Sequence, residues 1–259
     1  MSDQSNAIAG ADQPSARRSI IFTDGTDAIG EVVPAADGPS PIEGRLRKAP
    51  LRVPEGYGEC TGFTLFGRRI RSLLYSTDVA VIRNSNADAI FAVYPFTAQP
   101  AITQALLTVA EAPLFVGVGG GMTNGDRSVR LAEFSEHQGA SGVVVNAPIS
   151  NETIAKMKAV VDIPVVTTIV SGDMDIAGRL AAGADILNVS GASRTPEIVT
   201  KIRAEFPTVP IIATGGPREE DILRTIEAGA NAITYTPPTT GQLFADIMIS
   251  HRKNFSHQD

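Results

Sequence analysis

The sequence predicts an α/β fold, a (β/α)₈ barrel preceded by an N-terminal extension, and three observations favour this class. From about residue 69 onward, short runs rich in Val and Ile alternate with longer amphipathic runs, which is typical of parallel β/α units. The short runs number eight and are nearly continuous in apolarity, as expected for strands covered on both faces. A length of 259 residues suits one such barrel. An open doubly wound sheet, the alternative, would need about six strands and a clear switch point.

The elements can be placed by residue number. The predicted strands are 69–74, 89–94, 114–118, 142–146, 164–169, 186–190, 210–214 and 232–236. The predicted helices that follow them are 79–86, 100–111, 127–138, 151–160, 174–182, 196–206, 218–228 and 241–251. Expected N-caps are Asp126, Ser150, Asp173 and Thr195, and expected first helical residues are Pro196 and Pro217. Glycines expected to end helices in the left-handed conformation are Gly139, Gly183 and Gly229.

Three segments make up the predicted organisation. Residues 1–18 are polar and are expected to form a disordered tail, and residues 69–259 form the barrel. Residues 19–68 do not follow the β/α pattern, and a hairpin is expected between 19–22 and 31–33. We expect this extension to cover the bottom of the barrel or a neighbouring subunit, so a homo-oligomer is expected.

Composition excludes several classes of protein. Twenty-two basic and 28 acidic residues give a net charge of −6, which argues against a nucleic-acid partner. The chain shows neither a secretory signal nor an apolar run long enough for a membrane, so a cytoplasmic location is expected. Cys60 is the only cysteine and is interpreted as structural.

Histidine and lysine positions limit the chemistry further. His137, His251 and His257 fall on helices or at the C-terminus, so a histidine metal site and a histidine base at the barrel mouth are not expected. The lysines fall in the extension or on helices, which disfavours a Schiff-base aldolase. The sequence requires no cofactor, although flavin mononucleotide or a divalent cation remains open.

The active site of a (β/α)₈ barrel lies at the carboxyl ends of its strands, and four residues there are candidate catalytic groups. Asp78 and Asp173 follow strands and are candidates for a general base or for ligands of a divalent cation. The alternative is that both only cap helices. Tyr94 and Tyr235 are candidates for proton donation or for lining the pocket, with core packing as the alternative.

Four polar residues at strand ends are candidates for substrate binding. Asn146, Asn188 and Ser190 would be costly to bury without hydrogen-bond partners, and such residues commonly orient a ligand. Arg194 is a candidate clamp for a phosphate or carboxylate, unless it is only an exposed charge at the start of a helix.

Two glycine-containing loops are further candidates. Thr214-Gly215-Gly216 closes the seventh strand, where glycine lets backbone N–H groups approach an anion, with Gly191 as a helper from the sixth strand. The alternative is a tight turn. The loop at 117–121, which contains Gly119 and Gly120, fits an anion or a flat ligand, unless its glycines serve only loop conformation.

Residues 211–216, with Pro217 after them, resemble the seventh-strand phosphate loop of the ribulose-phosphate-binding and related aldolase-like barrels, over about residues 160–240. The chain departs from that pattern after the eighth strand, where Thr236-Pro237-Pro238 stands in place of a Gly-Ser turn. Residues 83–89, 91–96, 117–121 and 235–238 also resemble a group of bacterial barrel proteins labelled only "hydrolase", over most of 69–252. That second resemblance implies no mechanism.

These observations predict an enzyme that acts on a small phosphorylated metabolite by a lyase, isomerase or hydrolase step with Asp or Tyr acid–base groups. Two alternatives stay open. One is a flavin-dependent oxidoreductase whose cofactor phosphate occupies the seventh-strand loop and whose ring lies against residues 117–121. The other is a non-catalytic ligand-binding or scaffolding barrel.

Overall fold

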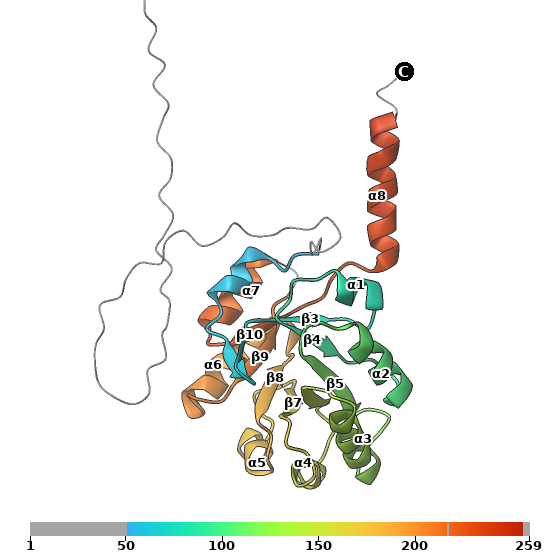
Figure 1. Cartoon of the computed structure of the whole chain (residues 1–259). Helices are drawn as coiled ribbons and strands as arrows, with labels where there is room; N and C mark the ends of the chain where they lie inside the picture. Colours follow the sequence, from blue (N-terminus) through green and yellow to red (C-terminus); the bar gives the residue numbers. More distant parts are fainter. Residues whose placement is uncertain (1–50, 217, 256–259) are drawn as a thin grey trace, which may run out of the picture. The chain divides into compact units, whose positions relative to one another are not determined.

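Eight parallel strands close into a barrel with helices around it, which confirms the predicted fold class (Figure 1). The structure is a computed structural model, and it describes residues 51–216 and 218–255. Around the barrel the strands follow the order β10-β3-β4-β5-β6-β7-β8-β9, so the last strand pairs with the first. This closed order rules out the open doubly wound sheet.

The strands and helices match the sequence pattern closely. The barrel strands are β3 (Ser72–Tyr75), β4 (Ala89–Ala92), β5 (Leu114–Gly119), β6 (Gly142–Val145), β7 (Val165–Ile169), β8 (Ile186–Val189), β9 (Ile211–Thr214) and β10 (Ala232–Tyr235). The helices are α1 (Val79–Arg83), α2 (Pro100–Val109), α3 (Asp126–His137), α4 (Asn151–Lys158), α5 (Ile176–Ala181), α6 (Thr195–Glu205), α7 (Glu219–Glu227) and α8 (Thr240–Phe255).

The first predicted strand, 69–74, is wrong as a single element. Its first part is β2 (Arg68–Ile70), which pairs antiparallel with β1 (Phe63–Leu65), and the barrel strand β3 begins only at Ser72. Phe66 and Gly67 join β1 to β2 with φ angles of 46° and 78°, the left-handed backbone that a two-residue hairpin turn requires. The hairpin predicted at 19–33 lies outside the described residues, as do the tail 1–18 and Pro217.

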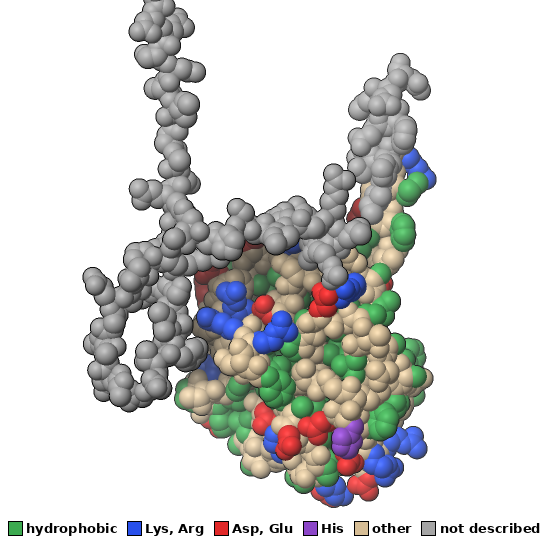
Figure 2. Space-filling view, in the orientation of Figure 1, with side chains coloured by type: hydrophobic (Ala, Val, Ile, Leu, Met, Phe, Trp, Pro, Cys, Tyr) green, Lys and Arg blue, Asp and Glu red, His purple; other side chains and the backbone are tan. Residues whose placement is uncertain are grey.

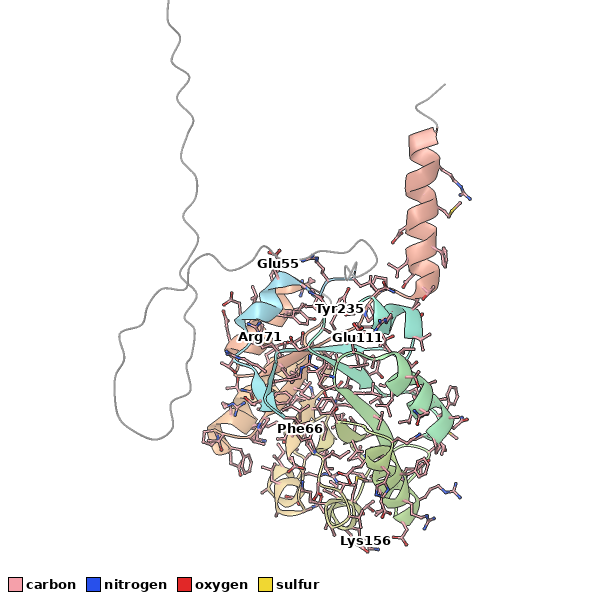
Figure 3. All side chains as sticks on the ribbon, viewed as in Figure 1. Glu55, Phe66, Arg71, Glu111, Lys156 and Tyr235 are labelled. Atoms are coloured by element: carbon pink, nitrogen blue, oxygen red, sulfur yellow. The ribbon has the colours of Figure 1, made fainter. Side chains whose placement is uncertain are left out.

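The β1–β2 hairpin covers the amino-terminal end of the barrel. Leu65 and Ile70 are buried and pack in one cluster with the side chains that fill the barrel interior. Phe66, at the tip of the hairpin, is 69% exposed (Figure 3). The part of the extension that the structure describes therefore plugs the bottom of its own barrel.

The barrel interior changes from apolar to polar along the strands. Because strand side chains alternate between two faces, every second residue points inward. One interior layer is apolar: Leu73, Phe91, Phe115, Val144, Val166, Ile186, Ile212 and Ala232. Two residues further along, the residues that line the cavity at the barrel mouth are mostly polar: Tyr75, Val93, Asn146, Thr168, Asn188, Thr214 and Thr234. The apolar layer supports the polar one.

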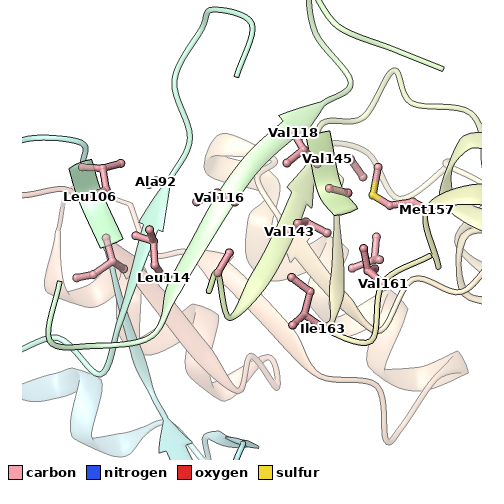
Figure 4. Packing of buried hydrophobic residues seen from close by; sticks show 14 of the residues in the cluster. Ala92, Leu106, Leu114, Val116, Val118, Val143, Val145, Met157, Val161 and Ile163 are labelled. Atoms are coloured by element: carbon pink, nitrogen blue, oxygen red, sulfur yellow. The ribbon is translucent and has the colours of Figure 1, made fainter. Parts of the chain in front are cut away.

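A second apolar layer lies between the strands and the surrounding helices (Figure 4). In it, Leu106 of α2 and Met157 of α4 pack with outward-facing residues of β5 and β6 such as Val116 and Val143. Each such side chain contributes roughly 1.5–3 kcal/mol when fully buried. The barrel is thus held on both faces, as the continuous apolarity of its strands predicts.

Helix ends follow the predicted chemistry in part. Ser150 caps α4, where its Oγ accepts a hydrogen bond from Thr153 N at 3.2 Å. Asp126 and Thr195 are instead the first residues of their helices, and α5 begins two residues later than expected, so Asp175 caps it and Asp173 does not. Pro196 lies in the first turn of α6 as predicted. The three predicted terminal glycines have positive φ: Gly139, Gly183 and Gly229.

The short 3₁₀ helix η2 (Glu55–Glu59) covers β10. It packs beside α7, and the ring of Tyr57 meets the ring of Tyr235 edge-on at 6.3 Å. Tyr57 also donates a hydrogen bond to Thr234 O at 3.3 Å. Burial, the largest cause, raises the pKa of Tyr57 well above its ordinary value.

The last helix, α8, begins at a polar contact and carries exposed apolar residues. Thr240 donates a hydrogen bond to the carboxylate of Asp78. Phe244, Met248 and Ile249 are exposed, and hydrophobic side chains are visible along this helix (Figure 2). None of the described helices is both long and apolar enough to cross a membrane.

Candidate active site

A cavity of about 260 Å³, here called the mouth cavity, opens at the carboxyl ends of the barrel strands. Its lining residues are Tyr75, Phe91, Val93, Asn146, Thr168, Asn188, Ser190, Thr214, Thr234 and Thr236. Four of the predicted binding residues meet here: Asn146, Asn188, Ser190 and Thr214. None of the lining side chains carries a formal charge at neutral pH, so the polar groups of the cavity are hydroxyls and amides.

Asn188 is buried at the wall of the mouth cavity with one polar atom unpaired. It is 7% exposed, and its Nδ2 donates to Thr168 Oγ1 at 3.2 Å from the neighbouring strand. Its Oδ1 is buried and has no hydrogen-bond partner in the protein. A buried amide oxygen without a partner costs roughly 1–3 kcal/mol, and because this oxygen has almost no exposed surface, a ligand in the mouth cavity meets it only after the side chain shifts.

A second cavity of about 530 Å³, here called the outer cavity, lies beside the mouth at the end of β9. Its lining residues are Ala192, Ser193, Pro196, Thr214, Gly215, Gly216, Arg218, Asp221, Arg224 and Thr225. Thr214 lines both cavities, so they adjoin at the end of β9. The predicted residues Thr214, Gly215 and Gly216 therefore lie together.

The two glycines of this loop differ in why glycine is needed. Gly216 has a φ of 86°, a left-handed conformation that other residues rarely adopt. A Cβ at Gly215 would come within 2.8 Å of Ile222 and Ile233, so Gly215 allows close packing of α7 on the barrel. The tight turn explains why residue 216 is a glycine. It does not explain the outer cavity, which the same loop also lines.

Basic groups exceed acidic ones in the outer cavity. Arg218 Nε lies 3.0 Å from Asp221 Oδ2, and Arg224 forms a second ion pair with the same carboxylate. The hydrogen bond from Arg218 lowers the pKa of Asp221 most, and the hydrogen bond from Arg224 lowers it further. Asp221 therefore stays ionised at neutral pH. Two cations and one anion leave a local excess of one positive charge.

Gly191 and Arg194 flank the outer cavity but are not among its lining residues. The Gly191 N–H donates a hydrogen bond to Thr195 Oγ1 at 3.0 Å. The N–H group that was expected to help hold an anion therefore already has a partner within the protein. Arg194 ends the short helix η3 (Ala192–Arg194) and is exposed.

The two candidate acids lie outside the mouth lining. Asp78 caps α1, accepting from Ala80 N at 2.9 Å and Val81 N at 3.2 Å, as the capping alternative expects. The hydrogen bond from Thr240 is the largest cause that lowers its pKa. The side chain of Asp173 is 91% exposed and pairs with Lys201 at 3.4 Å.

Neither candidate tyrosine is among the residues that line the mouth cavity, although the small cavity beside Tyr94 shares Val93 and Asn146 with it. Tyr94 lines a small cavity of about 60 Å³ between the loops after β4 and β5, and its hydroxyl accepts from Gln99 N at 2.9 Å. Tyr235 packs against the hydrophobic core and against Tyr57, which fits the core-packing alternative (Figure 3).

The glycine loop after β5 is shaped by contacts within the chain. A Cβ at Gly119 would fall 2.1 Å from Ser128 Oγ, and one at Gly120 would fall 2.4 Å from Asn146 O. Gly120 also has a φ of 84°. These glycines let the loop pass close to α3 and to the end of β6, and Gly119 also lines the small cavity near Tyr94.

Sequence reasoning missed Arg218, Arg224 and Tyr75 as site residues, and it did not single out Thr168 and Thr234. A signal existed for the threonines: both are polar residues at inward-facing positions near the ends of otherwise apolar strands. For the arginines the sequence offered none: Arg218 directly precedes α7 and Arg224 lies within it, and only the fold places both beside β9.

The described residues contain no group of three or more His, Cys, Asp or Glu side chains that could hold a metal ion. Hard cations such as Mg²⁺ favour carboxylate oxygens, and the mouth cavity offers only neutral ones. The residues of the mouth therefore do not fit a divalent cation.

No protein-family model and no curated protein matches this chain. Solved structures do resemble it. A 2,3-dimethylmalate lyase of the PEP mutase/isocitrate lyase superfamily is 14% identical, over 76% of this chain and 84% of its own, with a TM-score of 0.57. Phosphoenolpyruvate phosphomutase from Streptomyces platensis subsp. rosaceus is 13% identical, over 71% and 81%, with a TM-score of 0.55.

Phosphonopyruvate hydrolase in complex with oxalate and Mg²⁺ is 14% identical, over 73% of this chain and 82% of that chain, with a TM-score of 0.53. At these identities the likeness concerns the fold alone. Together with the closed eight-stranded barrel, it defines the chain as a (β/α)₈ barrel.

Proposed function

We propose that this protein is a barrel enzyme acting on a small phosphorylated metabolite, with the phosphate in the outer cavity and the remainder in the mouth cavity. The observation that carries the proposal is the position of Thr214, which lines both cavities at the end of β9. A ligand spanning the two would meet basic groups at one end and neutral polar groups at the other.

The amino-terminal end of α7 supports an anion in the outer cavity. No side chain caps this helix, so its first N–H groups are available to an anion, which the helix dipole also favours. Arg218 and Arg224 add positive charge at the same place. Glu219 and Glu220 are exposed and are not among the lining residues.

A lyase, isomerase or hydrolase step fits this architecture. The structural neighbours that support it include a lyase, a phosphomutase and a hydrolase, all on the same fold. Asp78, Asp173, Tyr94 and Tyr235 stay predictions for the acid–base groups. Tyr75 joins them because its hydroxyl-bearing side chain lines the mouth cavity, where a phenol can donate or accept a proton.

Titration calorimetry with inorganic phosphate tests the location of the phosphate. In the double variant Arg218→Gln/Arg224→Gln we expect the Kd for phosphate to rise about tenfold, because both positive charges that line the cavity are removed. The matched control is Arg127→Gln/Arg130→Gln, which removes the same charge from exposed positions on α3. Equal affinity in all three proteins, or no phosphate binding to the wild type at millimolar concentrations, would overturn the proposal.

A further inference from the structure

We infer that the mouth cavity binds an uncharged, hydroxyl-bearing group of the ligand, a polyol rather than a carboxylate, and that Asn188 and Thr168 recognise it. This inference rests on the proposed function only for the phosphate at the other end of the ligand. The observations that carry it are the unpartnered Asn188 Oδ1 and the neutral lining of the cavity.

Asn188 and Thr168 together present one acceptor and one donor. Asn188 lines the cavity, and a small shift of its side chain would let Oδ1, which has almost no exposed surface in the structure, accept an O–H or N–H group of a ligand. Thr168 Oγ1 already accepts from Asn188 Nδ2, which leaves the Thr168 hydroxyl proton for a ligand acceptor. Because a hydroxyl group is both donor and acceptor, two neighbouring hydroxyls on one ligand satisfy both residues.

The remaining lining continues the same chemistry. Asn146, Ser190 and Thr236 add neutral groups that can each donate and accept. Tyr75 and Phe91, whose rings lie 6.3 Å apart and tilted by 34°, supply an apolar surface for the C–H groups of such a ligand. Hydroxyl and amide groups next to aromatic rings match a polyol, which is polar at its oxygens and apolar along its carbons.

A carboxylate does not match this cavity. Burying an ionised carboxylate without a cation costs several kcal/mol even after relaxation, and no lining residue of the mouth is cationic. The cavity also lacks the carboxylate side chains that would hold Mg²⁺ to neutralise such a ligand. Phosphonopyruvate hydrolase, whose structure contains oxalate and Mg²⁺, shares this fold. The mouth cavity of the present protein is lined by neutral side chains and is therefore suited to an uncharged group.

Two ligands of equal length test the inference: glycerol 1-phosphate and 3-phosphoglycerate, which differ in a terminal CH₂OH or COO⁻ group. Calorimetry with both ligands, and with inorganic phosphate as the reference, measures how much the mouth cavity adds to the binding affinity. We expect glycerol 1-phosphate to bind about tenfold more tightly than inorganic phosphate, and 3-phosphoglycerate no more tightly than the reference. Tighter binding of 3-phosphoglycerate than of glycerol 1-phosphate would overturn the inference.

Two neighbouring threonines give a matched pair of variants. Thr168→Val removes the hydroxyl in the mouth and should weaken glycerol 1-phosphate about tenfold without changing the affinity for inorganic phosphate. Thr167→Val makes the same change one residue earlier in β7, at a buried residue that is not among the mouth lining, and should change neither affinity. If the two variants behave alike, Thr168 does not contact the ligand and the inference is wrong.

The failure of the proposed function would be distinguishable. If inorganic phosphate and both esters fail to bind, the phosphate site is absent, and erythritol then tests the mouth alone by saturation-transfer NMR. Saturation transfer to erythritol in the wild type and its loss in Thr168→Val would support the polyol site. No transfer to erythritol in the wild type would overturn it.

Discussion

Asp221 forms ion pairs with two arginines of its own segment, Arg218 three residues before it and Arg224 three residues after it. Both arginines line the outer cavity, and so does Asp221. The carboxylate therefore orients the two guanidinium groups and at the same time competes with any anion for them.

This competition predicts that Asp221→Asn binds inorganic phosphate more tightly than the wild type. Exposed ion pairs are weak, so freeing the arginines should lower the Kd by only about two- to fivefold. Calorimetry at low ionic strength measures the effect, and added salt should reduce it. Weaker phosphate binding in the variant would show that Asp221 serves mainly to position the arginines.

Thr167→Val should stabilise the fold. Thr167 is fully buried in β7, and its hydroxyl has no hydrogen-bond partner, so a methyl group of the same size removes an unmet polar group. We expect a gain of about 0.5–2 kcal/mol in the free energy of unfolding, measured by urea denaturation. Thr64→Val, at an exposed position of β1, is the control and should change little.

Gly120→Ala should destabilise the protein more than Gly67→Ala. Both glycines have positive φ, 84° and 78°, so both variants carry the backbone cost of about 1–2 kcal/mol. Only at Gly120 does the new Cβ meet other atoms, at 2.4 Å from Asn146 O, whereas nothing lies within 4 Å at Gly67.

The additional cost at Gly120 should be about 1–3 kcal/mol, because the end of β6 must move. Urea denaturation of the two variants measures the difference. Since Asn146 also lines the mouth cavity, ligand affinity should fall in Gly120→Ala alone. Equal destabilisation of the two variants would mean that the loop moves aside without strain.

Cys60 should be unreactive in the folded protein. It is 2% exposed, and burial, the largest cause, raises the pKa of its thiol to about 11, so only about one molecule in a thousand carries a thiolate at pH 8. Labelling with a chromogenic disulfide reagent should be slow in buffer and fast in denaturing urea. Rapid stoichiometric labelling of the folded protein at pH 8 would contradict the buried position.

The same pKa shift predicts a loss of stability in alkali. A thiol whose pKa is raised by folding stabilises the folded state below its unfolded pKa, and this stabilisation is lost as the pH rises towards 11. The free energy of unfolding should therefore fall above about pH 9. Cys60→Ala should show a smaller fall over the same range, while buried Tyr57 contributes a loss of the same sign at higher pH.

Most of the barrel could be predicted from the sequence, because its signal is local. A strand buried on both faces, such as Gly142–Val145, is apolar throughout, and a glycine such as Gly183 marks the end of a helix by its backbone alone. The division between β2 and β3 could not be predicted. The single strand predicted at 69–74 spans parts of both elements, and only the pairing with β1 shows that Ile70 belongs to the hairpin.

The candidate site was predicted only in part. Asn146 and Asn188 could be found, because a polar residue at the end of an apolar strand points to the barrel mouth. The roles of Asp78 and Tyr235 depend on which face of the strand or helix they occupy and on what covers that face. Tyr235 packs against Tyr57, a residue nearly two hundred positions earlier in the chain, and no local pattern reports such a contact.

The β1–β2 hairpin closes the amino-terminal end of the barrel and leaves the mouth cavity open at the carboxyl ends of the strands. Leu65 and Ile70 fill the amino-terminal end, so in the part of the chain that the structure describes, a molecule in the mouth cavity enters and leaves past the loops at the carboxyl ends of the strands. Uptake and release then share one route. A mutation in those loops that slows the arrival of a ligand should slow its departure by the same factor, which changes turnover while leaving the equilibrium affinity as it was.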